Sequence, residues 1–334
     1  MRRQFLKGCL SLGALWLTSS CKKGGGDNTP KSDRLRIAVI PKGTTHEFWK
    51  SVHAGAVKAA REFDVDIVWK GPLKEDDLKG QVDVVQSFTA QKVSGIVLAP
   101  LNDKALVSSV SAAIGAKIPV VIFDSALAGG AITSFVATDN RAAGRLAGDR
   151  MAELLGGKGK LILLRYQEGS ASTHEREEGF LEAVRKHPGL ELVSDNQYGG
   201  ATTESAFAAS ERVLLSKAAG NESALGVFTP NESTTFGMLL ALQKAKLAGK
   251  IKFVGFDASD KLVQAVQNGE INALVMQNPF NMGYLSVKAM VSALRGGQVE
   301  ARTDTGAKLV DKANLDTPEI KELVKPDLEK WLGK

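Results

Sequence analysis

Short apolar runs alternate with longer amphipathic segments along most of this chain, and this alternation constrains the fold more than any other feature. Most runs are continuous in Val, Ile and Leu, as expected for strands buried on both faces of a parallel sheet. Strands that alternate with helices in this way predict a doubly wound α/β fold. About ten strands is rather many for one open twisted sheet, so we expect two sheets and hence two lobes. The predicted strands are 35–40, 66–69, 95–99, 120–123, 134–137, 160–164, 190–193, 224–228, 252–256 and 273–276, and the clearest helices are 47–63, 78–92, 141–155, 175–187, 205–218 and 233–248.

The first twenty residues have the order of a secretory signal peptide. A basic start with Arg2, Arg3 and Lys7 precedes an apolar segment at 9–17 that is too short to span a bilayer as a permanent helix. The opening RRQFLK also resembles a twin-arginine export signal, which implies export of a folded protein. An ordinary Sec leader with paired arginines is the alternative. Both interpretations take the protein out of the cytoplasm.

Cys21 directly follows this leader and is the predicted lipidation site. The small residues before it resemble a bacterial lipobox, although Thr18 stands where Leu is most usual. Residues 21–33 lack apolar side chains able to pack, and their Gly and Pro content suits a flexible tether. We therefore expect a lipoprotein whose folded body is held at a membrane by its lipid anchor alone.

Composition excludes several classes of site. The two cysteines, Cys9 and Cys21, both belong to the leader region, so the body has no disulfide and no thiolate metal site. The formal net charge of +6 includes the basic start of the leader, and Lys and Arg are mixed with Asp and Glu elsewhere. This pattern is typical of a solvated surface and argues against nucleic-acid binding. Roughly 300 residues beyond the tether suffice for two domains.

Polar side chains follow four of the predicted strands, where a doubly wound sheet binds its ligands. They comprise two carboxylates and two carboxamides: Asp124, Asn231, Asp257 and Gln277. Such groups suit a polyhydroxylated ligand, because they accept from some hydroxyls and donate to others. The alternative for Asn231 and Asp257 is a structural role as helix N-caps.

The sequence resembles the periplasmic sugar-binding proteins of the ribose-binding type, which share their fold with the effector domain of lac-repressor-like regulators. The resemblance covers nearly the whole chain from about Leu35. Its markers stand in order: EFWKSV at 47–52 with Gly55, GIVLAP at 95–100, PVVIFD at 119–124, TDN at 138–140 with Gly144, REEGF at 176–180, NE at 231–232, VGFD at 254–257 and QNP at 277–279.

That resemblance implies a type I periplasmic-binding-protein fold with two Rossmann-like lobes and a hinge that the chain crosses three times. The first lobe would comprise residues 34–137 and 278–306, and the second 138–277 and 307–334. Ligand would be captured as the lobes close.

The resemblance also assigns ligand contacts. Phe48 and Trp49 match the aromatic pair that packs on the sugar ring, although Phe48 also suits a helix core. Arg176 matches an arginine that donates to sugar oxygens, whereas its charged surroundings (HEREEG) favour a surface position. Asp124, Asn231, Asp257 and Gln277 match hydrogen-bonding positions.

Two departures put ribose itself in doubt. His46, near Thr45, stands where the ribose type has Asn, and Ser125 stands where it has a second arginine. These three residues are further candidate contacts, although a surface role suits His46 equally well.

The function that the resemblance implies is capture of a monosaccharide or related polyol and its delivery to an ABC-transporter permease, by a monomer without cofactor or metal. The alternative is a sugar-sensing protein that presents its ligand to a membrane receptor or sensor kinase. A regulator would need an N-terminal helix-turn-helix in place of the leader. Enzyme motifs are missing, and a glycosidase pair formed by Asp124 and Asp257 is improbable in this fold.

Overall fold

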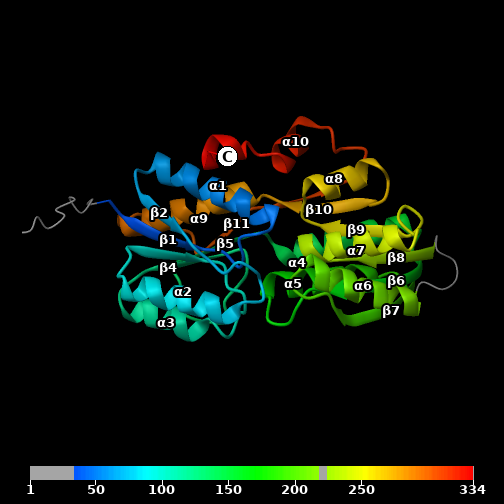
Figure 1. Ribbon diagram of the computed structural model, residues 1–334, viewed down its shortest axis with the longest axis horizontal. Helices are drawn as coiled ribbons and strands as arrows, with labels where there is room; N and C mark the ends of the chain where they lie inside the picture. Colours follow the sequence, from blue (N-terminus) through cyan, green and yellow to red (C-terminus); the bar gives the residue numbers. More distant parts are fainter. Residues whose placement is uncertain (1–33, 218–223, 334) are drawn as a thin grey trace, which may run out of the picture. The chain divides into compact units, whose positions relative to one another are not determined.

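Residues 34–217 and 224–333, described by a computed structural model, form two six-stranded sheets (Figure 1). The strand order is β11-β5-β4-β3-β1-β2 in one sheet and β12-β10-β9-β8-β6-β7 in the other. We call the parts of the chain built around them the first and the second lobe. The strands of the first lobe are β1 (Arg36–Ile40), β2 (Asp66–Trp69), β3 (Gly95–Leu98), β4 (Val120–Phe123), β5 (Ser134–Ala137) and β11 (Arg302–Asp304). The strands of the second lobe are β6 (Lys158–Arg165), β7 (Gly189–Tyr198), β8 (Leu225–Phe228), β9 (Lys252–Phe256), β10 (Ala273–Gln277) and β12 (Ala307–Val310). The predicted signal peptide, tether and Cys21 lie outside the described residues.

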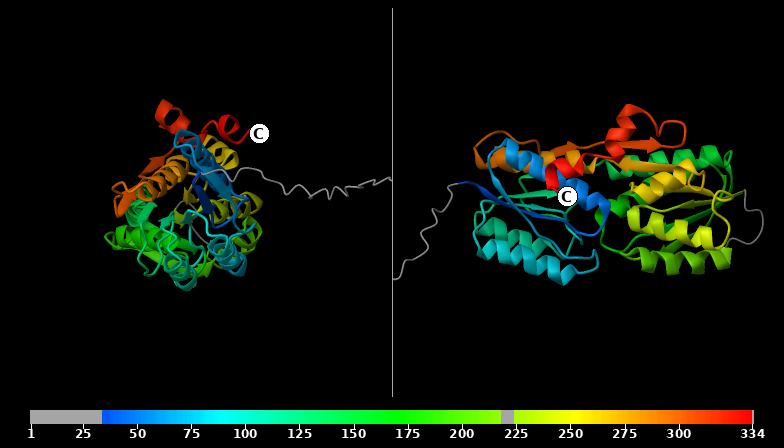
Figure 2. Two further views of the ribbon diagram at one scale, coloured as in Figure 1. Left: turned by 90° about the vertical axis from the view of Figure 1, so that its left-hand side faces the viewer. Right: turned by 45° about the horizontal axis from the view of Figure 1, so that its top comes forward.

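Helices cover both faces of each sheet (Figure 2). Successive residues of a strand point to opposite faces, and because residues of both sets are apolar here, both faces of the sheet are buried. In β1, Ile37 and Val39 pack in one core cluster with α1 and α9, and Ala38 and Ile40 pack in another with α2 and α3. The second sheet packs α4 and α5 on one face and α6, α7 and α8 on the other. This arrangement confirms the predicted two-lobed, doubly wound α/β fold. The helices are α1 (Glu47–Glu62), α2 (Leu78–Ala90), α3 (Val107–Gly115), α4 (Asn140–Leu154), α5 (Ala171–Val184), α6 (Thr203–Lys217), α7 (Glu232–Lys244), α8 (Asp260–Gln267), α9 (Pro279–Leu294), α10 (Pro318–Val324) and α11 (Leu328–Leu332).

Glycine pairs bring two helices of each lobe unusually close together. A Cβ at Gly55 of α1 would lie 1.8 Å from the carbonyl oxygen of Phe280 in α9. A Cβ at Gly144 of α4 would lie 2.1 Å from the carbonyl oxygen of Arg176 in α5. Only glycine permits such close backbone approach. These contacts fix α1, which carries the predicted aromatic pair, and α5, which carries Arg176.

The chain passes between the sheets after β5, after β10 and between β11 and β12. Two of these segments are joined where they run together. Thr138 Oγ1 lies 3.2 Å from Thr305 Oγ1, and the Asp139 N–H donates to Asp304 Oδ1 at 2.9 Å.

The end of the chain departs from the expected second lobe. Residues 307–334 were expected there, and α10 does pack Ile320 into the core of that lobe. However, α11 contacts α1 of the first lobe, where Arg61 donates to the carbonyl oxygens of Lys330 and Trp331 at 3.2 and 3.1 Å. Trp331 also lies beside Phe280 of α9, and this aromatic contact helps to hold α11 against the first lobe.

The short edge strands were not predicted. β11 is a polar three-residue strand and β12 is only four residues long, so neither has a readable apolar pattern. Among the described strands, β12 alone runs antiparallel to its neighbour.

Helix α5 begins at Ala171, four residues before the predicted start. Its first turn is polar but buried, so no apolar pattern marks it in the sequence. Within the described ranges, no helix is long and apolar enough to cross a membrane.

Candidate ligand-binding site

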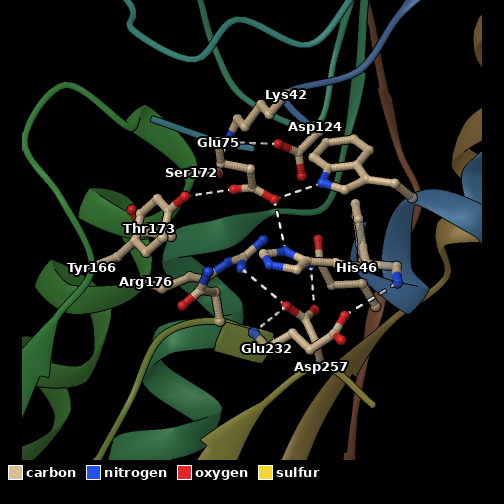
Figure 3. A pocket seen from close by; sticks show the side chains of 14 residues that line it. Lys42, His46, Glu75, Asp124, Tyr166, Ser172, Thr173, Arg176, Glu232 and Asp257 are labelled. Atoms are coloured by element: carbon tan, nitrogen blue, oxygen red, sulfur yellow. Dashed lines mark hydrogen bonds and ion pairs between the residues drawn. The ribbon is translucent and has the colours of Figure 1, made fainter. Parts of the chain in front are cut away.

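A cavity lies where strand ends of both lobes face each other (Figure 3). It measures about 30 Å³, room for a water molecule or two. A larger ligand therefore enters only if the side chains or the lobes move apart. The lining residues are Lys42, His46, Phe48, Trp49, Glu75, Asp124, Tyr166, Ser172, Thr173, Arg176, Asn231, Glu232, Asp257 and Gln277.

Asp124 and Asp257 occupy equivalent places in the two lobes. Each follows a buried phenylalanine at the end of a strand and has a positive φ, of 61° and 66° respectively. Each backbone N–H donates to the next strand, to Val136 at 3.0 Å and to Val275 at 2.9 Å. Asp tolerates this left-handed conformation better than most residues. The two carboxylates are thereby held at the cavity, where the strand-end rule predicted them.

The charges on these aspartates are balanced differently. Asp124 Oδ2 lies 2.8 Å from Lys42 Nζ in a buried ion pair, but the approach is not along a hydrogen-bond direction, so this oxygen keeps its accepting capacity. Asp257 accepts from Gln277 Nε2 at 2.7 Å and from the Glu232 N–H at 3.1 Å, and its Oδ2 lies 4.0 Å from Arg176. Burial raises the pKa of Asp257 against the opposing effects of Arg176 and Gln277.

Arg176 is only 2% exposed, which contradicts the surface position suggested by its charged surroundings. Its Nε donates to Asn140 Oδ1 at 2.8 Å and its Nη1 to the Pro230 carbonyl at 2.9 Å. The guanidinium stacks 4.1 Å from the Phe256 ring centre. Nη2 has no hydrogen-bond partner, and neither has Gln277 Oε1; both residues line the cavity.

Asn231 combines both roles considered for it. It is the N-cap of α7, with its side chain accepting from the Thr234 N–H at 3.3 Å in a capping box, and it also lines the cavity. Asp257 is not a cap, because Ser259 caps α8.

Phe48 and Trp49 line the cavity and also belong to the core cluster beneath α1. Their rings meet edge to face, with centroids 4.9 Å apart. The Trp49 indole N–H donates to Glu75 Oε1 at 2.6 Å. These contacts fix one aromatic wall, supplied by the first lobe.

The three further candidate contacts lie in different environments. His46 lines the cavity and its Nδ1 lies 2.9 Å from Glu75 Oε1, so it is not a surface histidine. Thr45 is exposed and does not line the cavity. Ser125 is fully buried and does not line the cavity, and its Oγ accepts from the Ser172 N–H at 3.0 Å.

Six lining residues were not predicted: Lys42, Glu75, Tyr166, Ser172, Thr173 and Glu232. Lys42 and Tyr166 come just after β1 and β6, so the strand-end rule could have found both. Glu232 directly follows Asn231. Glu75 lies between β2 and α2. Ser172 and Thr173 lie in the first turn of α5, which the predicted helix at 175–187 did not include, and no pattern marks any of the three.

Several hydrogen bonds join the lobes around the cavity. Lys42 Nζ donates to Ser172 Oγ at 3.0 Å, and Tyr166 Oη donates to Glu75 Oε2 at 2.6 Å. Glu232, at the start of α7, accepts from the Phe48 N–H at the start of α1 at 3.2 Å. A carboxylate at a helix N-terminus is favourable. Burial nevertheless raises the pKa of Glu232 to about 7, opposed chiefly by the charge of His46.

Among the described residues, no group of three or more His, Cys, Asp or Glu side chains is placed to hold a metal ion. The cavity instead offers acceptors, donors and an aromatic wall, a combination suited to a small polar ligand with an apolar face.

Comparison with known proteins identifies the class. The profile of the periplasmic binding protein domain matches residues 37–298, and the chain belongs to this family of binding proteins. The chain is 29% identical to a ribose import binding protein of Haemophilus influenzae over 89% of this chain and 98% of that one.

Solved structures agree with this assignment. A carbohydrate transporter solute-binding protein from Agrobacterium radiobacter, in complex with D-arabinose, has a TM-score of 0.83 and 33% identity over 88% of this chain and 100% of that one. A solute-binding protein from Agrobacterium vitis with bound D-fucose has a TM-score of 0.82 and 35% identity over 87% of this chain and 100% of that one. The chain is therefore similar to ABC-transporter binding proteins of the ribose type along nearly their whole length.

Proposed function

We propose that this protein captures a monosaccharide or related polyol between its lobes and delivers it to an ABC-transporter permease, without catalysing a reaction. The relatives named above are a ribose import binding protein and two solute-binding proteins with D-arabinose and D-fucose bound. The wall formed by Phe48 and Trp49 suits the apolar C–H face of a sugar ring.

One observation carries the proposal. Four buried side-chain polar atoms in the described ranges lack a hydrogen-bond partner, and three of them belong to residues that line the cavity. Asp124 Oδ2 and Gln277 Oε1 are acceptors, and Arg176 Nη2 is a donor. Buried polar groups are normally satisfied. A sugar that donates two hydroxyls and accepts through a third oxygen would complete them.

Closure is the proposed mechanism of capture. The first lobe supplies the aromatic wall and Asp124, whereas the second supplies Arg176, Asp257 and Gln277. A ligand that bridges these groups binds the closed form better than the open form, and that difference shifts the population toward closure. The segments around Thr138 and Thr305 are the proposed hinge.

The location follows from the leader. We propose export by the signal peptide at 1–20 and anchoring through acylated Cys21, with residues 21–33 as the tether. Such an anchor keeps a monomeric binding protein near its transporter.

A thermal shift panel tests the function. D-ribose, D-arabinose, D-fucose, D-allose and xylitol are each added to the wild-type protein. A ligand at one hundred times its Kd stabilises the folded state by about 2.7 kcal/mol and raises Tm. Asp257→Ala should lose this rise, and the exposed control Asp83→Ala should keep it. If no sugar or polyol raises Tm, the proposal is wrong.

A further inference from the structure

Glu75 is a buried carboxylate in a segment without regular structure between β2 and α2, and its residue is only 7% exposed. Its two oxygens hold three side chains. Oε1 accepts from Trp49 Nε1 at 2.6 Å and faces His46 Nδ1 at 2.9 Å, while Oε2 accepts from Tyr166 Oη at 2.6 Å. In Figure 3 Glu75 lies between Tyr166 on one side and His46 on the other. The carboxylate is thus largely satisfied by protein.

These three partners come from different lobes. His46 is the N-cap of α1 and Trp49 lies in its first turn, both in the first lobe, whereas Tyr166 follows β6 in the second. A further contact between the lobes is made by the same residue, because the Glu75 carbonyl accepts from Gln167 Nε2 at 3.1 Å. The full set of bonds exists only when the lobes are together. Opening the lobes would remove the phenol donor from Oε2. Loss of this hydrogen bond costs free energy unless water fully replaces the donor.

Because this inference takes the cavity as the sugar site, it rests on the proposed function. We propose that Glu75 is a positioning residue that couples the aromatic wall and His46 to lobe closure, acting through Tyr166 rather than by contact with the ligand. Closure adds the phenol to a carboxylate that already fixes the indole edge and the imidazole. The ligand-facing surface is thereby arranged by the same bond that joins the lobes.

His46 reports on this arrangement. Carboxylates face it from three elements: Glu75 before α2, Glu232 at the start of α7 and Asp257 after β9. Burial lowers the pKa of His46, but the hydrogen bond and charge of Glu75, with the charges of the other two, raise it to about 9. Removal of the Glu75 charge leaves burial less opposed, so the pKa should fall toward or below its ordinary 6.5.

Two substitutions separate positioning from ligand contact. Glu75→Gln keeps the shape of the side chain but removes its charge and one acceptor oxygen. Tyr166→Phe removes only the hydroxyl that joins the lobes and leaves the carboxylate in place. Exposed Lys79→Ala on α2 is the matched control. Each protein is studied by NMR titration of His46, by small-angle X-ray scattering with and without sugar, and by calorimetry with the panel sugars named above.

We expect Glu75→Gln to lower the His46 pKa, to weaken sugar binding about tenfold and to increase the radius of gyration at saturating sugar. Tyr166→Phe should leave the high His46 pKa but also weaken binding and closure, by about threefold to tenfold. If Tyr166→Phe binds and closes like wild type, the coupling is wrong, even if Glu75→Gln loses binding through a direct contact.

An unchanged His46 titration in Glu75→Gln would also overturn the inference. Failure of the proposed function looks different, because wild type itself would then bind none of the sugars. In that case the NMR titration and the scattering of the sugar-free proteins still test whether Glu75 couples His46 to closure. Should Glu75→Gln fail to fold, Tyr166→Phe alone decides.

Discussion

The two lobes differ in the direction of one edge strand but otherwise share one arrangement of strands, and they supply different chemistry to the cavity between them. Both have the same strand order, a glycine-mediated close helix pair and an aspartate with positive φ after a strand-terminal phenylalanine. The first lobe adds an aromatic wall and the His46–Glu75 pair, whereas the second adds Arg176 and Gln277 with unpartnered atoms. The fold therefore repeats the position of a candidate binding residue, and the neighbouring side chains differ between the two positions.

The two aspartates should differ most in their effect on stability. Asp257→Ala removes the acceptor of Gln277 and Glu232 and leaves buried Arg176 less compensated, so we expect a loss of about 3 kcal/mol in the free energy of unfolding. Asp124→Ala should cost about 2 kcal/mol, since Lys42 retains Ser172 as an acceptor. Urea denaturation at pH 7 measures both. Equal losses would show that the lobes balance these charges alike.

The wall formed by Phe48 and Trp49 belongs to the first lobe, which predicts an asymmetric effect on affinity. Phe48→Leu keeps an apolar side chain but loses the flat face, and we expect sugar affinity to fall by up to about tenfold. Phe228→Leu, in the core of the second lobe and not among the residues that line the cavity, is the control: it should lower stability and leave Kd unchanged. Calorimetry with the panel sugars distinguishes them. A similar loss of affinity in both variants would show that Phe48 acts through packing of the protein core and not through a contact with the sugar ring.

Three site residues were predicted because they follow a recognisable strand, although Lys42 and Tyr166, which also follow strands, were missed. Residues whose place depends on tertiary contacts had no such marker. Asp124, Asp257 and Gln277 stand at strand ends that the apolar runs already located. Arg176 was placed in the site by resemblance alone, since only packing against α4 turns its charged surroundings into a buried position. Glu75 had no marker, because its role arises from three partners distant in the sequence. The contact of Trp331 with the first lobe was not predicted for the same reason.

The buried acids and His46 predict how stability changes with pH. Burial raises the pKa of Glu75, but the hydrogen bond and charge of His46, with Lys42 and Tyr166, lower it to about 2 from 4.5, so its contribution is lost as pH falls from 4.5 to 2. His46, raised from 6.5 to about 9, contributes fully below pH 6.5 and loses that contribution as pH rises to 9. Glu232, raised from 4.5 to about 7, adds a decline between pH 4.5 and 7.

Stability from these groups should therefore be greatest near pH 5 and fall toward pH 9. His46→Gln should remove the decline between pH 6.5 and 9 that His46 causes, while the decline due to Glu232 should move to higher pH, because the charge of His46 no longer opposes the raised pKa of Glu232. Urea denaturation of both proteins at intervals of pH measures the difference. A His46→Gln curve parallel to wild type above pH 6.5 would contradict the assigned shift.

Helix α11 has no counterpart in the repeated plan of the lobes and gives the smallest predicted effect. It reaches from the second lobe to α1, where Trp331 lies half-buried beside Phe280 and Arg61 donates to its carbonyl. Trp331→Ala should cost about 1 kcal/mol in stability and change sugar affinity less than about threefold, because the contact lies outside the cavity. Arg61→Ala breaks the same contact from the other side and should match it. A large change in affinity in both variants would mean that α11 restrains the lobes as they open, and closure would then depend on the segment that the two lobes do not share.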